Sequence, residues 1–207
     1  MKSVLISIQP KWCALIESGE KTLEVRKTRP KLDTPFKAYI YCTLSGSNEL
    51  FREVLNADIA AWNRGKWGNK KGNVIGEFIC DRIYYHTPDC LIVKEDREKA
   101  TEGSCLSRNQ LLAYLSGGKY VPGFKFPMSL LSDFYGWRIS GLKIYDKPKA
   151  LSTFCFPTER FCEPGLCSGC PKYEMPGEYG DVMWDCEWKR PIMRPPQNWC
   201  YVEELNV

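Results

Sequence analysis

Ser-Gly-Glu-Lys-Thr-Leu-Glu-Val-Arg, residues 18–26, is the stretch of sequence that decides the expected fold. Ahead of it, Pro10 suits the first turn of a helix, and Gly19 supplies the left-handed residue that ends one. Residues 23–26 then alternate apolar and polar, as a half-buried strand does. A short β-rich run at residues 4–8 precedes the helix. The opening of the chain therefore predicts a strand, a helix, a turn and a strand, in that order.

Farther along the chain, alternating and apolar runs predict strands over residues 36–43, 74–85 and 135–145. Helices are expected over residues 49–62 and 110–115, and solvated segments over residues 63–73 and 94–103. Five or six strands with two or three inserted helices predict an α+β domain. The simplest arrangement of these elements is a small mixed β-barrel with flanking helices.

Four residues match the fixed positions of the pattern G-x-K-x-x-E-x-R: Gly19, Lys21, Glu24 and Arg26. The segment resembles the signature of the ASCH family, and the strand–helix–turn–strand context is similar too. The resemblance covers residues 1–150 and implies a PUA-like β-barrel with a cleft beside the first helix. We therefore expect an ASCH domain over residues 1–150, with residues 151–207 forming a cysteine-rich extension packed on it.

The resemblance also implies a function. ASCH domains look like RNA-binding modules, and their relatives include domains that recognise modified bases, so RNA or a modified nucleotide is the expected partner. Some bacterial members are amidohydrolases that remove the acetyl group from N4-acetylcytidine nucleosides, and others have been assigned ribonuclease activity. Similarity to the amidohydrolases would place catalysis on Lys21, Glu24 and Glu102. However, Glu24 stands where those members carry a threonine nucleophile, and a carboxylate cannot replace that hydroxyl in forming an acyl intermediate.

The side chains of residues 18–26 favour a polar cleft on chemical grounds. Glu24 and Arg26 lie on one face of the expected strand, and Lys21 reaches over that face from the turn. A carboxylate accepts a hydrogen bond from an exocyclic amine, while a guanidinium presents a planar fork to phosphate or carbonyl oxygens. The alternative is a surface pair of Glu24 and Arg26 that contributes less than about 1 kcal/mol.

Three further residues are candidates for contacting the ligand. Arg29 belongs to the basic stretch that follows the strand, where phosphate contact is expected. Tyr41 lies on a strand face opposite to Ile40, either toward the cleft or in packing at the edge of the core. Trp137 lies where members of the ASCH family often carry an aromatic residue near the cleft.

Composition and charge narrow the classes of protein. Of the 207 residues, 43% are hydrophobic and 26% charged, which is typical of a globular protein. No run approaches the roughly 18–20 apolar residues of a membrane span, and the N-terminal run is too short for a secretory signal, so we expect a cytosolic protein. Residues 1–150 hold 24 Lys and Arg against 16 Asp and Glu, and this excess favours a polyanionic partner. Residues 151–207 are acidic overall, so a regulatory protein-interaction module is another alternative.

The cysteine cluster predicts a metal site. Cys162, Cys167 and Cys170 fall within nine residues, the last two as a C-x-x-C knuckle, and Cys186 follows after fifteen residues. Four thiolates at such spacings are typical of structural zinc, with Cys155 and Cys200 as alternates for the fourth ligand. An iron–sulfur cluster, a redox pair and plain thiols are the competing interpretations. A structural zinc would explain how a segment without periodic apolar residues stays ordered.

Overall fold

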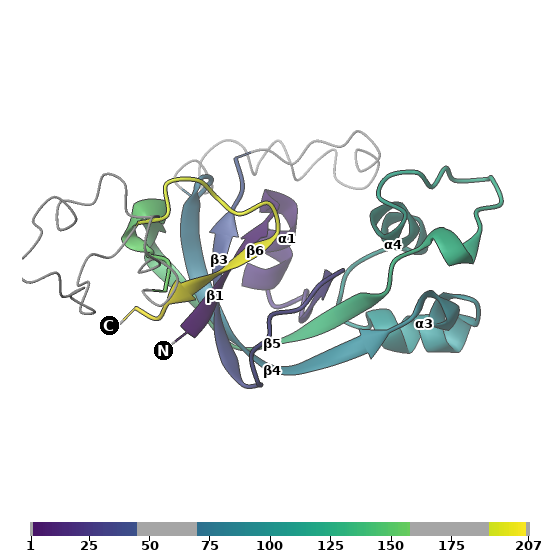
Figure 1. Ribbon diagram of the computed structural model, residues 1–207, viewed down its shortest axis with the longest axis horizontal. Coiled ribbons are helices and arrows are strands. Elements are labelled where there is room, and N and C mark those ends of the chain that lie inside the picture. Colours follow the sequence, from purple (N-terminus) through teal and green to yellow (C-terminus); the bar gives the residue numbers. More distant parts are fainter. Residues whose placement is uncertain (1, 45–69, 158–190, 206–207) are drawn as a thin grey trace, which may run out of the picture.

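The computed structural model describes residues 2–44, 70–157 and 191–205, which form a mixed α+β fold, as predicted. The strands are β1 (Lys2–Ile8), β2 (Leu23–Arg26), β3 (Phe36–Cys42), β4 (Asn73–His86), β5 (Phe134–Ala150) and β6 (Trp199–Glu203). The helices are α1 (Pro10–Glu17), α3 (Lys94–Thr101) and α4 (Arg108–Leu115), with 3-10 turns η2 (Pro88–Leu91), η3 (Met128–Leu130) and η4 (Leu151–Thr153). Figure 1 shows the long β4–β5 ribbon extending from the other strands to a lobe that holds α3 and α4.

All these strands form one sheet in the order β2-β5-β4-β3-β1-β6. The β1–β3 pair is parallel, with the crossover connection through α1 and β2 that such a pair requires, and the other pairs are antiparallel. The ladder is open, since β2 and β6 each have one neighbour. Its two edges are nevertheless joined: Trp199 Nε1 donates to Thr28 Oγ1 at 3.0 Å, and the Lys31 backbone N–H donates to the Tyr201 hydroxyl at 2.7 Å. Side-chain bonds thus link the edges of a curved sheet.

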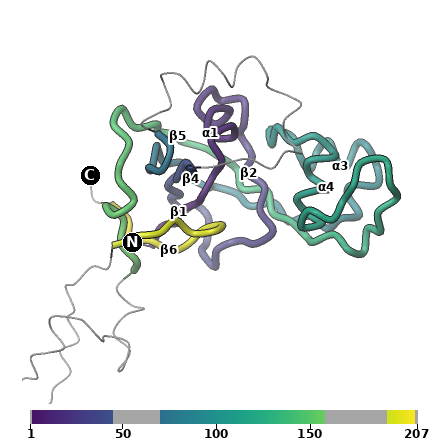
Figure 2. Tube along the Cα trace, turned by 90° about the horizontal axis from the view of Figure 1, so that it is seen from above, coloured from purple at the N-terminus to yellow at the C-terminus, as the bar shows by residue number. Residues whose placement is uncertain are grey.

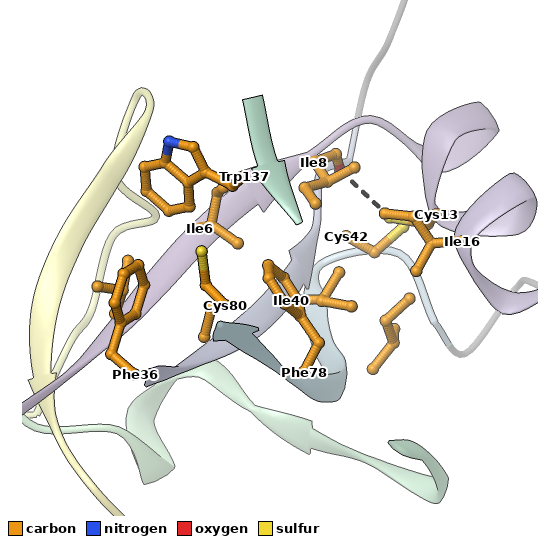
Figure 3. Close-up of a cluster of buried hydrophobic side chains, with 13 residues drawn as sticks. Ile6, Ile8, Cys13, Ile16, Phe36, Ile40, Cys42, Phe78, Cys80 and Trp137 are labelled. Atoms are coloured by element: carbon orange, nitrogen blue, oxygen red, sulfur yellow. Dashed lines mark hydrogen bonds between the residues drawn. The ribbon is translucent and has the colours of Figure 1, made fainter. Parts of the chain in front are cut away.

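The opening of the chain folds as its sequence predicts. Pro10 occupies the first turn of α1, and Ser18 caps its end. Gly19 follows with φ +81°, the left-handed conformation that ends a helix without steric cost. The inner face of α1 buries Cys13 and Ile16 in the first apolar cluster, between helix and sheet (Figure 3).

Two other apolar clusters complete the core. The second holds the lobe to the sheet and contains Val25 of β2 together with Leu111 and Leu115 of α4. The third covers the opposite face of the sheet, where Phe154 and Val202 pack with Tyr39 and Tyr41. Ile40 and Cys42 face the first cluster, as expected. The tyrosines point the other way, where Phe154, Ile192 and Val202 are among the described residues that cover them.

The C-terminal residues described by the structure belong to the sheet of the domain. β6 pairs antiparallel with β1, Val202 opposite Ser3, and Glu203 donates through its backbone N–H to the carbonyl of Cys155. These residues are held by a strand ladder and by the third apolar cluster. Figure 2 shows β6 beside β1, far from the α3–α4 lobe.

The charged residues 94–103 are mostly exposed, as expected. Lys94–Thr101 form the helix α3 within this segment, where no helix is expected, and Ala100 is its buried residue. The expected helix at residues 49–62 lies outside the described residues. Among the helices that the structure describes, none has the length and apolar character needed to span a bilayer.

Candidate functional site

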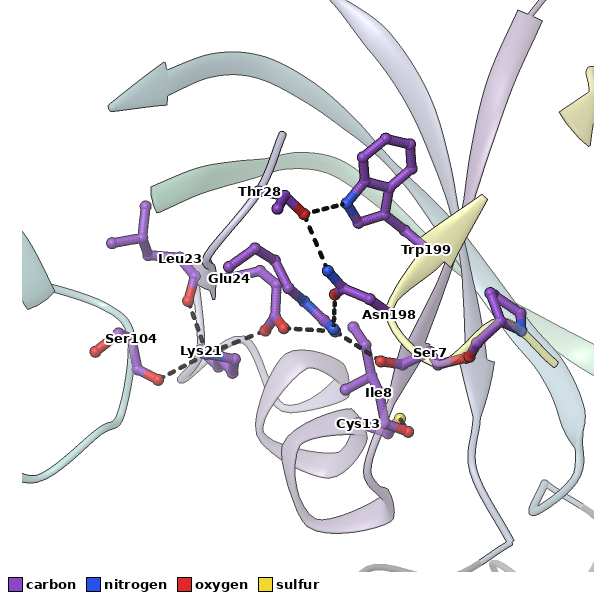
Figure 4. Close-up of polar contacts among 12 residues, drawn as sticks. Ser7, Ile8, Cys13, Lys21, Leu23, Glu24, Thr28, Ser104, Asn198 and Trp199 are labelled. Atoms are coloured by element: carbon purple, nitrogen blue, oxygen red, sulfur yellow. Dashed lines mark hydrogen bonds and ion pairs between the residues drawn. The ribbon is translucent and has the colours of Figure 1, made fainter. Parts of the chain in front are cut away.

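Lys21 lies in the turn between α1 and β2, and it is 3% exposed. Its ammonium donates to the backbone carbonyls of Leu23 and Ser104, each at 2.7 Å, and forms an ion pair with Glu24 Oε2 at 3.3 Å (Figure 4). Three acceptors match the three N–H bonds of an ammonium. Lys21 therefore ties together the turn, the strand that follows it and the loop before α4.

Gly103 makes this arrangement possible. Its carbonyl accepts hydrogen bonds from the backbone N–H groups of Thr22 and Leu23, at 2.8 and 3.0 Å. Its φ is +72°, and a Cβ added there would lie 2.1 Å from Thr22 Oγ1. A residue with a side chain would clash as well as be strained, so a glycine lets the loop approach closely enough for Ser104 to meet Lys21.

Glu24 and Arg26 form the next part of the site. They alternate with Val25 along β2, so both project to one face, and both are at least nine-tenths buried. Arg26 Nη2 lies 2.9 Å from Glu24 Oε1 and donates to the Ser7 carbonyl at 2.6 Å. Arg26 Nη1 donates to Asn198 Oδ1, also at 2.6 Å. Arg26 Nε is buried and has no hydrogen-bond partner among the residues that the structure describes.

A cavity of about 540 Å³ opens over these side chains. Lys21, Glu24 and Arg26 all line it, so the structure brings the three residues of the expected cleft together. Aromatic walls come from Trp12 on α1 and Tyr114 on α4. Side-chain amides also line it: Gln9, Gln110 and Gln197.

Cations lie close to both aromatic walls. The ammonium of Lys11 is 4.3 Å and that of Lys21 5.3 Å from the centre of the Trp12 ring, and that of Lys27 is 5.2 Å from the Tyr114 ring. Burial lowers the pKa of Lys11 to about 8 and also lowers the pKa of Lys27. Burial raises the pKa of Tyr114, so its hydroxyl stays neutral at physiological pH.

Four predicted residues lie outside the lining of this cavity. Arg29 is exposed beyond the end of β2, and Glu102 is exposed at the end of α3, one residue before Gly103. Tyr41 packs in the third apolar cluster because its strand face points away from α1. Trp137 is fully buried in the first cluster, where the centres of its ring and the Phe36 ring are 5.8 Å apart.

Several residues that line or support the cavity are not identified by any pattern in the sequence. Asn198 and Gln197 come from the other end of the chain, and no local pattern links them to β2. Ser104 acts through its backbone carbonyl, which any residue type supplies. Tyr114 lies on a helix that the sequence predicts, but its face could be assigned only once the lobe was placed against β2.

The expected metal ligands Cys162, Cys167, Cys170 and Cys186 lie outside the described residues. The structure describes the two alternates for the fourth ligand. Cys200 pairs with Leu5 in the β1–β6 ladder, and Cys155 forms an isolated antiparallel β-bridge, through backbone hydrogen bonding, with Pro191. Burial raises the pKa of Cys200 to about 11, which keeps it a neutral thiol. Within the described ranges no three His, Cys, Asp or Glu side chains gather as a metal site would require.

No protein-family model matches the chain, and no curated protein matches it either. Solved structures of the ASCH protein from Zymomonas mobilis are similar. A serine-to-alanine mutant of that protein has a TM-score of 0.51 at 15% identity, over 98% of this chain and 89% of the other. The unaltered protein has a TM-score of 0.48 at 16% identity, over 98% of this chain and 88% of the other. A tyrosine-to-phenylalanine mutant has a TM-score of 0.43 at 20% identity, over 73% of this chain and 77% of the other. The match to the serine-to-alanine mutant extends over nearly the whole chain, and it shows that the chain has the ASCH fold.

Proposed function

We propose that the cavity binds a nucleobase, presented by single-stranded RNA or by a modified nucleotide. The observation that carries the proposal is the pair of Glu24 and Arg26, buried and fixed in the wall of a cavity of about 540 Å³. This volume falls within the range of about 300–1,000 Å³ that small-molecule sites occupy. A few fixed polar groups beside aromatic walls are what recognition of a flat heterocycle requires.

Glu24 supplies the acceptor side of recognition. A carboxylate has about four lone-pair sites, and Arg26 and Lys21 each engage one oxygen. The remaining lone pairs are available to an exocyclic amine of a base. Lys21 holds Glu24 and the Ser104 loop, so its role is to position the carboxylate.

Charge supports a ligand that carries phosphate. Lys21 and Arg26 outnumber Glu24 in the cavity wall by one charge, and Lys27 also lines it. Cationic side chains at a base pocket are placed to contact the phosphates on either side of the base. RNA supplies both groups in one molecule.

Hydrolysis of N4-acetylcytidine is the alternative with a specific test. Glu24 is engaged by two cations, and the Lys21 ammonium donates to two carbonyls. Neither group is therefore free to activate a nucleophile by abstracting its proton. Incubation of the protein with N4-acetylcytidine should release no acetate above a protein-free control, and release at enzymatic rates would show that the site is catalytic as well as a binding site.

The binding proposal is tested with a labelled twelve-nucleotide RNA of random sequence. Glu24→Gln keeps the shape of the side chain but removes the charged acceptor, so affinity should fall about tenfold or more. Glu20→Gln is the matched control because Glu20 is exposed in the same turn and does not line the cavity. Affinity should also fall as salt rises, since phosphate contacts release counterions. Equal affinities for the two variants would refute the proposal.

A further inference from the structure

The loop after α4 carries an exposed aromatic side chain on a hydrogen-bonded turn. In the segment Val121-Pro122-Gly123-Phe124, the Phe124 backbone N–H donates to the Val121 carbonyl at 3.2 Å, and Gly123 has φ +88°. Proline followed by a glycine of positive φ is typical of a type II turn, which holds its corners in one conformation. The Phe124 side chain is 75% exposed.

The residues on either side anchor this turn. Tyr120 is 7% exposed, and its hydroxyl donates to Asn109 Oδ1 at 3.0 Å. Its ring packs edge-on against that of Phe126, with the ring centres 6.2 Å apart. Its backbone N–H donates to Ser116 Oγ at 2.9 Å. The aromatic residues before and after the turn therefore face the lobe, while Phe124 is directed into water.

The surroundings of Phe124 are basic. Lys119 and Lys125 are exposed, five residues before it and one residue after it in the chain, and residues 108–131 contain three Lys and Arg but no Asp or Glu. An exposed aromatic ring between lysines matches a nucleic-acid strand, whose bases stack and whose phosphates pair with the cations.

The turn is also continuous with the cavity. Gly117 and Gly118, at the end of α4, line the cavity, and six residues lead from Gly118 to Phe124. Six residues span at most about 22 Å when fully extended, which sets the greatest distance between rim and ring. Figures 1 and 2 both show this loop on the lobe that carries α4.

We infer that the turn at residues 121–124 is a second contact for single-stranded RNA, where Phe124 stacks on a base that flanks the one held in the cavity. The inference rests on the proposed function of the cavity. Lys119 and Lys125 contact the phosphates beside that base. We expect a single nucleotide in the cavity to leave the turn unoccupied, whereas a strand that fills a site of about 4–16 nucleotides extends to it.

The test compares two ligands on the full chain: the labelled twelve-nucleotide RNA, and the four ribonucleoside 5′-monophosphates observed by saturation-transfer NMR. Phe124→Ala should weaken binding of the twelve-nucleotide RNA about five- to 100-fold and leave the monophosphates unaffected. Phe124→Trp should restore the affinity, and Phe124→Leu should not, because leucine is apolar but has no π-face. Leu130→Ala, which removes another exposed side chain of the lobe (62%), is the control and should change nothing.

The outcomes separate this inference from the proposed function. If Glu24→Gln weakens both ligands and Phe124→Ala weakens neither, the cavity binds a nucleotide and the inference is wrong. If Phe124→Leu binds the RNA as tightly as the native chain, an apolar contact rather than stacking is at work, and the inference is again wrong. If the native chain binds neither ligand, the proposal that single-stranded RNA presents the base to the cavity fails, and this inference fails with it.

Discussion

Arg26 and Asn198 are 172 positions apart in the chain, yet the guanidinium of the first donates to the side-chain oxygen of the second at 2.6 Å. Arg26 ends β2, one edge of the sheet, and Asn198 precedes β6, the other edge. Asn198 also donates to Thr28 Oγ1 at 3.1 Å. The site is thus built where the two edges of an open sheet meet, and the C-terminal residues help to hold its arginine.

Replacing Asn198 tests this link. Asn198→Ala should lower the free energy of unfolding by about 1–3 kcal/mol, because it leaves the buried guanidinium without one of its acceptors. Asn198→Asp keeps an oxygen for Arg26 and should retain most of the stability. Urea unfolding at pH 7 measures both variants. An aspartate variant as unstable as the alanine variant would show that the bond to Arg26 is not what stabilises this junction.

Removing the Lys21 ammonium should be far more costly. Lys21→Met leaves Glu24 buried with one cation fewer and two carbonyls without a donor, a loss of about 3–5 kcal/mol. Lys31→Met is the control, since Lys31 is exposed and a surface change is usually within about 0.5 kcal/mol. The double variant Lys21→Met/Glu24→Met removes both partners of this ion pair but leaves Arg26 without its carboxylate, so its loss should be smaller than the sum of the two single losses. Additive losses in the two single variants would argue against a coupled pair.

The close approach at Gly103 makes a third prediction. Gly103→Ala should lower the free energy of unfolding by about 2–5 kcal/mol, since strain at a positive φ adds to a clash with Thr22 Oγ1. Gly19→Ala isolates the strain, about 1–2 kcal/mol, because φ is +81° there and nothing lies within 4 Å of the added Cβ. Adding Thr22→Ala to Gly103→Ala should relieve the clash. No recovery in that double variant would mean that the loop does not pack as described.

The affinity for RNA should depend on pH through Lys11. Its pKa is lowered to about 8 by burial, so its positive charge beside Trp12 is lost as the pH rises through that value. Binding of the labelled RNA should weaken between pH 7 and 9, well before ordinary lysines titrate near 10.4. The same shift makes folding more favourable from about pH 8 towards 10.5, because the folded state binds fewer protons there, so this group does not unfold the protein in that range.

Lys11→Arg is the matched variant for the pH measurement. An arginine keeps its charge between pH 7 and 9, so the decline in affinity of this variant should begin at higher pH. Lys27, whose pKa is also lowered by burial, should then cause a smaller part of the decline. Anisotropy titrations at four pH values and constant ionic strength are sufficient. An identical decline in the native chain and the variant would assign the pH dependence to another group.

Local patterns in the sequence predicted the elements of the site. The turn at Gly19 and the alternation in β2 placed Glu24 and Arg26 on one face, because strand periodicity is a property of neighbouring residues. The same reasoning put Ile40 and Cys42 on the inner face of β3. It could not say what covers Tyr41, since that depends on a segment more than a hundred residues away.

The remaining errors have the same physical origin. Trp137 pairs with Glu24 in the β2–β5 ladder, so it is close to the site, but its side chain is buried in the first cluster and does not line the cavity. Glu102 is adjacent to Gly103 in the chain, and its side chain is exposed while the next two residues contact the Lys21 turn. Spacing along a chain does not reveal on which side of a loop such a side chain emerges.

Binding of a base beside Glu24 can be observed in a crystal structure of the full chain, soaked with a mixture of the four ribonucleosides and N4-acetylcytidine. We expect electron density for a base in the cavity between Trp12 and Tyr114, with an amino group within hydrogen-bond distance of Glu24. A base bound elsewhere on the protein, with solvent alone in this cavity at saturating nucleoside, would contradict it.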